Sequence, residues 1–168
     1  MHWTRALLVA TAMFGGSAAS AQDAEVLQSF TRADLKEALV ANGATHEDAE
    51  TGRNISITFN GGIRGDGLLL ACEDEETERG CYGTSLLATF SAKEGTSPEA
   101  VTAAINEYNY RENFGRAYMS PDGTISVRLY IISDGGITKE NYARQIGLWV
   151  ASLEDFFGYL YGEEEENT

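Results

Sequence analysis

Apolar residues recur at the spacing of an amphipathic helix in three segments of the chain. The first segment follows Thr31, which is placed to cap a helix that ends near Gly43. The second begins at Ser97-Pro98-Glu99, and the third follows the capping residue Thr138. The apolar stripe of the second contains Val101, Ala104, Ile105 and Tyr108, and that of the third contains Tyr142, Ile146, Trp149, Val150, Leu153, Phe156, Phe157 and Leu160. The pattern predicts three helices, the last with a broad aromatic stripe.

Five further segments have the pattern and the flanking turn signals of β-strands, and they span residues 55–60, 68–72, 82–90, 114–119 and 124–131. We interpret the glycine-rich stretches 60–62 and 65–67 and the segment 120–123 as turns, and the polar stretch 44–53 as a loop. The resulting order is α-β-β-β-α-β-β-α. Short hairpin connections in this order predict an α+β fold, with helices packed on one face of an antiparallel sheet.

The N-terminal segment has the pattern of a cleavable secretory signal peptide. Arg5 precedes a short apolar run from Ala6 to Phe14, and small residues at Ala19 and Ala21 form a cleavage site. A membrane anchor is the alternative, but the run has about half of the roughly 20 apolar residues that a spanning helix needs. We expect residues 1–21 to be removed and the mature protein to be periplasmic or secreted.

The chain is strongly acidic, and this bears on its partners. The formal net charge is −14, and loss of the signal peptide removes the positive charge of Arg5 and no acidic residue, which gives −15. Such a chain is repelled by nucleic acids and by anionic membrane surfaces, so we expect neither as a partner after signal cleavage. Residues 22–162 are expected to form a single domain, and the acidic tail 163–168 is expected to be disordered.

Cys72 and Cys81 flank an acidic segment, residues 73–80, with apolar runs on both outer sides. In an exported protein, this arrangement predicts a disulfide that staples the ends of a hairpin. Free thiols are the main alternative. A redox-active pair is typically spaced Cys-x-x-Cys at the start of a helix, which is not the spacing found here.

No residue pattern amounts to a catalytic, metal or cofactor signature. His46 is the only histidine after the signal peptide, too few for a zinc site, and no nucleophile motif accompanies it. The stretch 61–65 lacks the lysine of a phosphate-binding loop and is interpreted as a hairpin turn. We therefore predict no catalytic residue, no metal and no cofactor. Two alternatives stay open: weak calcium binding by the acidic runs 73–78 and 163–166, and an enzyme that uses converging carboxylates.

The aromatic stripe of the last helix is the main candidate for an interaction surface. Trp149, Phe156 and Phe157 belong to this stripe, which has more apolar surface than one sheet face obviously needs. The plain interpretation is core packing. The more specific interpretation is that part of this helix, together with exposed strand faces, forms a surface that binds a second copy of the chain or another protein.

The second half of the chain, from about Val101 to Leu160, resembles the YbjN family of bacterial sensory transduction regulators. The resemblance rests on an asparagine-rich segment that closes a helix, an arginine-bearing strand, a Pro-Asp-Gly turn, and the Asp134-Gly135-Gly136 loop before the last helix. Asn106, Asn109 and Arg116 match the family motif. We expect structural roles for them: asparagines that tie the helix end to the next strand, and an arginine that pairs locally.

The resemblance implies a fold similar to type III secretion chaperones, often paired into dimers, with no enzyme activity and no catalytic residues. The signal peptide and the cysteine pair depart from many members, which moves the expected site of action to the periplasm. We therefore expect a non-enzymatic, exported, regulatory or chaperone-like module that binds a protein partner. The alternative is a binder of a small ligand or a carboxylate-based enzyme.

Overall fold

The computed structural model describes residues 25–162. The expected signal peptide and acidic tail lie outside these residues. The helices are α1 (Arg32–Ala41), α2 (Pro98–Arg111), α3 (Lys139–Tyr161) and the short 3-10 turn η1 (Asn60–Gly62). The strands are β1 (Val26–Leu27), β2 (Thr45–Asp48), β3 (Ile55–Thr58), β4 (Arg64–Asp74), β5 (Arg79–Phe90), β6 (Arg116–Met119), β7 (Ile125–Ile132) and β8 (Ile137–Thr138).

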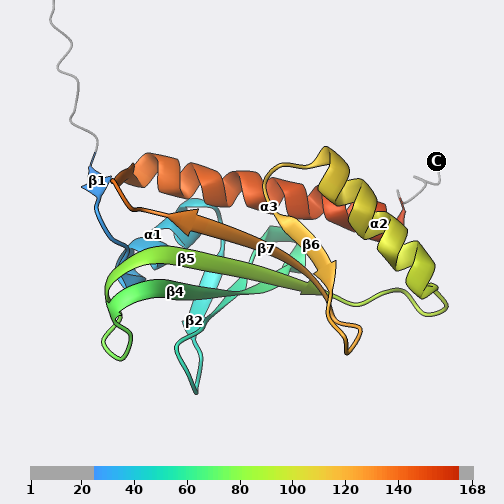
Figure 1. Ribbon diagram of the computed structural model, residues 1–168, viewed down its shortest axis with the longest axis horizontal. Coiled ribbons are helices and arrows are strands. Elements are labelled where there is room, and N and C mark those ends of the chain that lie inside the picture. Colours follow the sequence, from blue (N-terminus) through green and yellow to red (C-terminus); the bar gives the residue numbers. More distant parts are fainter. Residues whose placement is uncertain (1–24, 163–168) are drawn as a thin grey trace, which may run out of the picture.

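Six of the strands form one antiparallel sheet in the order β2-β3-β4-β5-β7-β6. The short strands β1 and β8 form a separate antiparallel pair. The three α-helices lie on one side of the large sheet, and α3 runs along most of its length (Figure 1). The predicted α+β class, the antiparallel sheet and the packing of helices on one face are confirmed.

The core lies between the helices and the face of the sheet that they cover, which we call the inner face. Strand residues that point to it alternate along β3, β4, β5 and β7, as the period of a strand requires. They include Ile55, Ile57, Leu69, Leu86, Val127 and Ile131, none more than 2% exposed. Gly67 lets α1 approach this face, because a Cβ there would lie 3.2 Å from side-chain atoms of Leu35 and Ile57.

The predicted helix starts are confirmed. Thr31 and Asp34 form a capping box at the start of α1, in which each side chain bonds the backbone N–H of the other. Ser97 and Thr138 cap α2 and α3 by accepting bonds from the backbone N–H groups of Ala100 and Asn141. These side chains satisfy donors that the first turn of a helix leaves free.

The structure differs from the sequence prediction in three places. Residues 45–48 were expected in a loop but form the edge strand β2, which pairs with β3. Gly65 and Gly67 were expected in a turn but lie within β4 and pair with Ala88 and Leu86. The pair β1–β8 was not expected. In all three places the residues belong to a strand because their backbone pairs with a neighbouring strand. The hydropathy pattern does not reveal this pairing, because the residues involved are polar, small or few.

Candidate interaction surface

The helices leave one side of the six-stranded sheet uncovered, and we call this side the outer face. Its side chains alternate along the strands with the buried residues of the inner face. Five outer-face residues of β4, β5 and β7 form what we call the apolar patch: Leu68, Leu70, Leu87, Tyr130 and Ile132. A sheet face that meets water normally carries polar side chains. The apolar patch therefore needs a separate explanation.

The strand register brings the members of the apolar patch together. Leu70 lies opposite Gly83, which lies opposite Ile132 on the next strand. A Cβ at Gly83 would lie 3.3 Å from Cβ of Leu70 and 3.6 Å from Cδ1 of Ile132. The two side chains therefore flank the glycine from both sides and form a row across β4, β5 and β7. In the adjacent row, Leu68 and Tyr130 lie on either side of Ser85.

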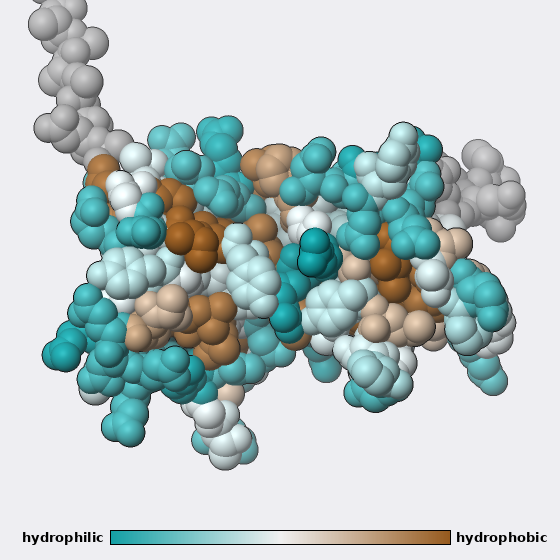
Figure 2. Space-filling view, in the orientation of Figure 1, coloured by the Kyte–Doolittle hydropathy of each residue, from teal (hydrophilic) through white to brown (hydrophobic). Residues whose placement is uncertain are grey.

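The apolar patch reaches solvent on β7, where Ile132 is 60% exposed and Tyr130 is 54% exposed. Figure 2 shows apolar surface, in brown, over the ends of β4, β5 and β7 that lie toward β1. Strongly hydrophilic groups, in dark teal, occupy the middle of the same view. Single exposed apolar residues are ordinary, but a contiguous apolar area beside charged groups is typical of an interaction site.

Next to the apolar patch, four residues of β6 and β7 line a cleft of about 440 Å³, which we call the arginine cleft: Arg116, Tyr118, Arg128 and Tyr130. Arg116 and Arg128 lie directly opposite each other in the strand register. The Arg128 guanidinium carbon lies 5.3 Å from the ring centroid of Tyr118 and 5.6 Å from that of Tyr130. One arm of the same guanidinium donates a 2.9 Å hydrogen bond to the Tyr130 hydroxyl. Arg128 is thus held between two aromatic rings.

The charge of the outer face contrasts with that of the whole chain. Its charged residues are Glu47 on β2 and Arg64, Asp66, Asp74, Arg79, Arg116 and Arg128 on β4, β5, β6 and β7, four positive against three negative. The chain as a whole has a formal net charge of −14. The charged residues of this face on β6 and β7, Arg116 and Arg128, are both positive, so this part of the outer face would attract acidic groups of a ligand at short range.

The interaction-surface prediction needs correction for two of its three residues. Trp149 and Phe156 are fully buried in the core, where Trp149 packs edge-on against Phe59 and Phe156 against Phe90. Neither can contact a partner in this structure. Phe157 is 46% exposed and lies against Tyr161, with 4.3 Å between ring centroids. Its role in an interaction stays a prediction.

The three residues of the family motif occupy different environments. The Asn109 side chain accepts a hydrogen bond from the backbone N–H of Ala117 and donates one to its carbonyl, at 2.9 and 3.0 Å. It ties α2 to the free edge of β6, which is the structural role expected. Within residues 25–162, Asn106 forms no side-chain hydrogen bond, and Arg116 forms no ion pair but lines the arginine cleft. The expected local partner for Arg116 is therefore missing from the described part of the chain.

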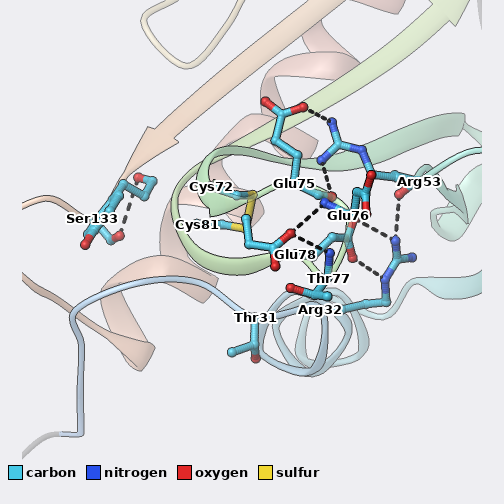
Figure 3. The surroundings of a disulfide bond; sticks show 12 residues. Thr31, Arg32, Arg53, Cys72, Glu75, Glu76, Thr77, Glu78, Cys81 and Ser133 are labelled. Atoms are coloured by element: carbon cyan, nitrogen blue, oxygen red, sulfur yellow. Dashed lines mark hydrogen bonds and ion pairs between the residues drawn. A yellow bond between two sulfur atoms is a disulfide. The ribbon is translucent and has the colours of Figure 1, made fainter.

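The disulfide joins Cys72 of β4 to Cys81 of β5, which lie directly opposite each other beneath the hairpin turn (Figure 3). Cys81 is fully buried, and its carbonyl accepts a 2.6 Å hydrogen bond from the backbone N–H of Phe30. The expected staple of a hairpin is what the structure contains.

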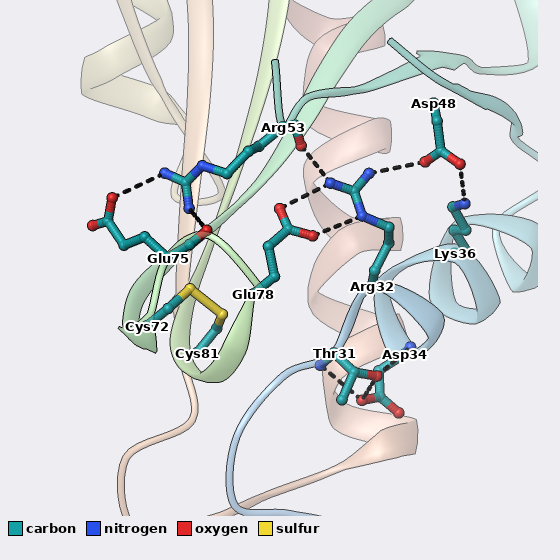
Figure 4. Close-up of polar contacts among 10 residues, drawn as sticks. All are labelled: Thr31, Arg32, Asp34, Lys36, Asp48, Arg53, Cys72, Glu75, Glu78 and Cys81. Carbon is teal, nitrogen blue, oxygen red and sulfur yellow. Dashed lines mark hydrogen bonds and ion pairs between the residues drawn. A yellow bond between two sulfur atoms is a disulfide. The ribbon is translucent and has the colours of Figure 1, made fainter. Parts of the chain in front are cut away.

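Arg32 connects the acidic turn of this hairpin to α1 and β2. Its guanidinium donates hydrogen bonds to Glu78, to Asp48 and to the backbone carbonyl of Arg53, and Asp48 also pairs with Lys36 (Figure 4). The pKa of Arg32 is raised, mainly by its hydrogen bond to Glu78. The pKa of Asp48 is lowered, mainly by its hydrogen bond from Lys36. The network fixes the hairpin turn against the first helix.

The acidic residues of the hairpin point to individual partners rather than to a common centre. Glu75 pairs with Arg53, Glu73 accepts a hydrogen bond from the Tyr82 hydroxyl, and Asp74 accepts two from backbone N–H groups. Among the described residues, no group of three or more His, Cys, Asp or Glu side chains is placed to hold a metal ion. His46 lies on β2, opposite Ile57, rather than in the loop expected. The run 73–78 thus gives the calcium alternative no geometric support, and the run 163–166 lies outside the described residues.

Sequence reasoning missed the apolar patch and the arginine cleft, although both leave a trace in the sequence. Residues 68–70 are consecutive leucines, which places apolar side chains on both faces of a strand. The pairs Arg116/Tyr118 and Arg128/Tyr130 repeat the same two residue types at the strand period. Only the strand register shows that these two pairs are neighbours.

No helix among the described residues has the length and apolarity needed to cross a bilayer.

Comparison with known proteins gives a family and structural neighbours. The sequence profile of YbjN, described as "Putative bacterial sensory transduction regulator", matches residues 31–161. Among solved structures, the crystal structure of YbjN, a putative transcription regulator from E. coli, is similar with a TM-score of 0.47 and 11% sequence identity. The similar region covers 72% of this chain and 90% of that chain. No curated protein matches the sequence.

Proposed function

This chain belongs to the YbjN family, and from that premise we propose that it is an exported, non-enzymatic module that binds a protein partner in a regulatory or chaperone-like role. The family description, a sensory transduction regulator, fits a protein that acts by binding another molecule rather than by catalysing a reaction. The outer face of the sheet is the surface that we assign to this contact.

Two features support export. The sequence begins with the pattern of a cleavable signal peptide. The disulfide between Cys72 and Cys81 would persist in an oxidising compartment and would be reduced in most bacterial cytosols. Both features agree with a periplasmic or secreted protein.

The apolar patch is the observation that carries the binding proposal. Leu70 and Ile132 flank Gly83 on a sheet face that no helix of residues 25–162 covers, and Ile132 and Tyr130 are more than half exposed. Burying an exposed aliphatic side chain of this size contributes about 1.5–3 kcal/mol, so such a row favours association. A complementary partner presents apolar side chains to the row.

The charge of the outer face narrows the chemistry of that partner. Arg116 and Arg128 stand beside the apolar patch without an ion-pair partner among the described residues. Opposite charges across an interface fix the orientation of the two molecules and speed their encounter. We therefore expect a partner protein that carries carboxylates next to its apolar side chains.

A comparison of two charge substitutions tests the proposal. The tagged protein is crosslinked in its native cells as wild type, as Ile132→Asp and as Val40→Asp. Val40 lies on α1 and, like Ile132, is a β-branched aliphatic residue that is 60% exposed. We expect one reproducible crosslinked protein that is lost in Ile132→Asp and kept in Val40→Asp, with thermal melts showing that both variants fold. Loss in Val40→Asp alone, or in neither variant, contradicts the assignment of the outer face.

A further inference from the structure

The two arginines of the arginine cleft lack the counter-charges that five of the six other arginines in the described residues have; the sixth, Arg64, stands alone on β4. Arg32, Arg53, Arg79, Arg111 and Arg144 each lie within 4 Å of a carboxylate oxygen. Arg116 and Arg128 have no such partner in the described part of the chain, and they lie opposite each other on adjacent strands. Like charges in directly opposed positions destabilise a strand pair. Within residues 25–162 this pair is not neutralised, and the cleft between the two strands therefore has a place for an external anion.

Arg128 is held in a fixed position with donors to spare. The rings of Tyr118 and Tyr130 contact its guanidinium, and one of its five N–H donors is used by the Tyr130 hydroxyl. Its Nε is buried and has no hydrogen-bond partner among the described residues. A buried donor without an acceptor is costly, and native structures rarely leave one unsatisfied. Since Nε is closed to solvent, the donors that an external oxygen can reach are the remaining N–H groups of the two Nη atoms, at the cleft that Arg128 lines.

We propose that the arginine cleft binds a doubly charged oxyanion of the phosphate type, either inorganic phosphate or the phosphoryl group of an organic ligand. A phosphate group carries a charge of about −1.5 to −2 near pH 7, which balances two guanidinium groups. The planar fork of donors on an arginine matches two oxygens of such a group. The cleft volume of about 440 Å³ falls in the usual range for small-molecule sites.

The two sources of the phosphate group place different demands on the cleft. Inorganic phosphate would use the arginine donors and the tyrosine hydroxyls alone. A phosphoryl group on an aromatic or sugar body would also contact the rings of Tyr118 and Tyr130, which adds apolar contact area. This site goes beyond the proposed protein-binding function, because its ligand is a small anion and not a protein. Its test accordingly uses small anions and no protein partner. Either proposal can therefore fail without the other.

A titration followed by ¹H–¹⁵N NMR tests the site directly. Sodium phosphate is added to the ¹⁵N-labelled protein at neutral pH, with sodium chloride of matched ionic strength as the blank. The backbone signals of β6 and β7 and the Nε–Hε signals of Arg116 and Arg128 are followed. We expect saturable shifts confined to these signals, and an affinity about tenfold or more lower in Arg128→Gln and in Arg116→Gln, as the loss of a hydrogen bond to a charged group implies.

Arg64→Gln is the matched control, because Arg64 lies on the same outer face but on β4, away from the cleft. This variant should bind phosphate as wild type does. Phenyl phosphate then separates the two sources: tighter binding than inorganic phosphate assigns the site to an organic phosphoryl ligand, and equal binding assigns it to free phosphate. Shifts no larger than those with chloride, or shifts that persist in Arg116→Gln and Arg128→Gln, overturn the proposal.

Discussion

Arg32, in the first turn of α1, forms a two-pronged ion pair with Glu78, which lies 46 positions further along the chain. Its Nε and Nη2 atoms lie 2.7 and 2.8 Å from the two oxygens of the carboxylate. Both side chains are shielded from solvent, with 29% and 11% of their surface exposed. This pair holds the turn of the disulfide hairpin against the helix layer.

Replacement of Arg32 by glutamine should lower the free energy of unfolding by about 1–3 kcal/mol, because hydrogen bonds to a charged group are lost and Glu78 is left mostly buried without its partner. Urea unfolding followed by circular dichroism measures the change. Arg79→Gln is the control, since Arg79 is 77% exposed and pairs with Asp74 at 3.9 Å. It should change stability by no more than about 0.5 kcal/mol. Equal losses in the two variants would contradict the assigned role of Arg32.

The disulfide should contribute about 2–3 kcal/mol to stability, since it closes a short loop between positions separated by nine. The double variant Cys72→Ser/Cys81→Ser should unfold at a correspondingly lower urea concentration while keeping its circular dichroism spectrum. The intact mass of the purified protein should fall two hydrogens below that of its reduced form. An unchanged mass after reduction would show that the bond does not form in the isolated protein.

Two asparagines of the family motif should differ sharply in their effect on stability. Asn109→Ala removes two hydrogen bonds to the backbone of Ala117 and should cost about 1–2 kcal/mol. Asn106→Ala removes an exposed side chain on the same helix and should change stability by less than about 0.5 kcal/mol. Thermal or urea unfolding of the two variants in parallel gives the comparison. A larger loss for Asn106→Ala would reverse the roles assigned here.

The ion pairs around α1 should make stability depend on pH in the acid range. The hydrogen bond from Lys36 is the main cause that holds the pKa of Asp48 below its ordinary value of 3.8. A carboxyl group with a lowered pKa in the folded state stabilises the fold above its ordinary pKa, and this contribution is lost as the pH falls through the lowered value. Wild type should therefore be more stable than Asp48→Asn at neutral pH. Melting temperatures of the two proteins should begin to converge as the pH falls below 3.8 and should meet below the lowered pKa, whereas a constant difference would argue against this linkage.

Local sequence signals predicted the elements that local chemistry determines. Thr31, Ser97 and Thr138 cap the three helices as their positions in the pattern indicated, because capping involves residues only three positions apart. The pairing of Cys72 with Cys81 was likewise accessible, because the two flank one polar turn.

The hydropathy pattern of the sequence could not predict features that depend on strand register or on burial. Trp149 and Phe156 share a stripe with Phe157, yet the first two are buried by the sheet while Phe157 is not. Periodicity identifies the stripe but does not give the width of the surface that covers it. Arg116 and Arg128 become neighbours only through the antiparallel register of β6 and β7.

The central claim is that the outer face of the sheet contacts a protein partner, and site-specific photo-crosslinking tests it most directly. A photoreactive amino acid is placed at position 132 on the outer face or at position 40 on α1, two sites with the same exposed fraction. After irradiation of native cells, we predict a discrete covalent adduct from position 132 and none from position 40. An adduct of twice the protein's mass would identify a second copy as the partner, and a different mass another protein. An adduct from position 40 alone, or from neither position, would contradict the account.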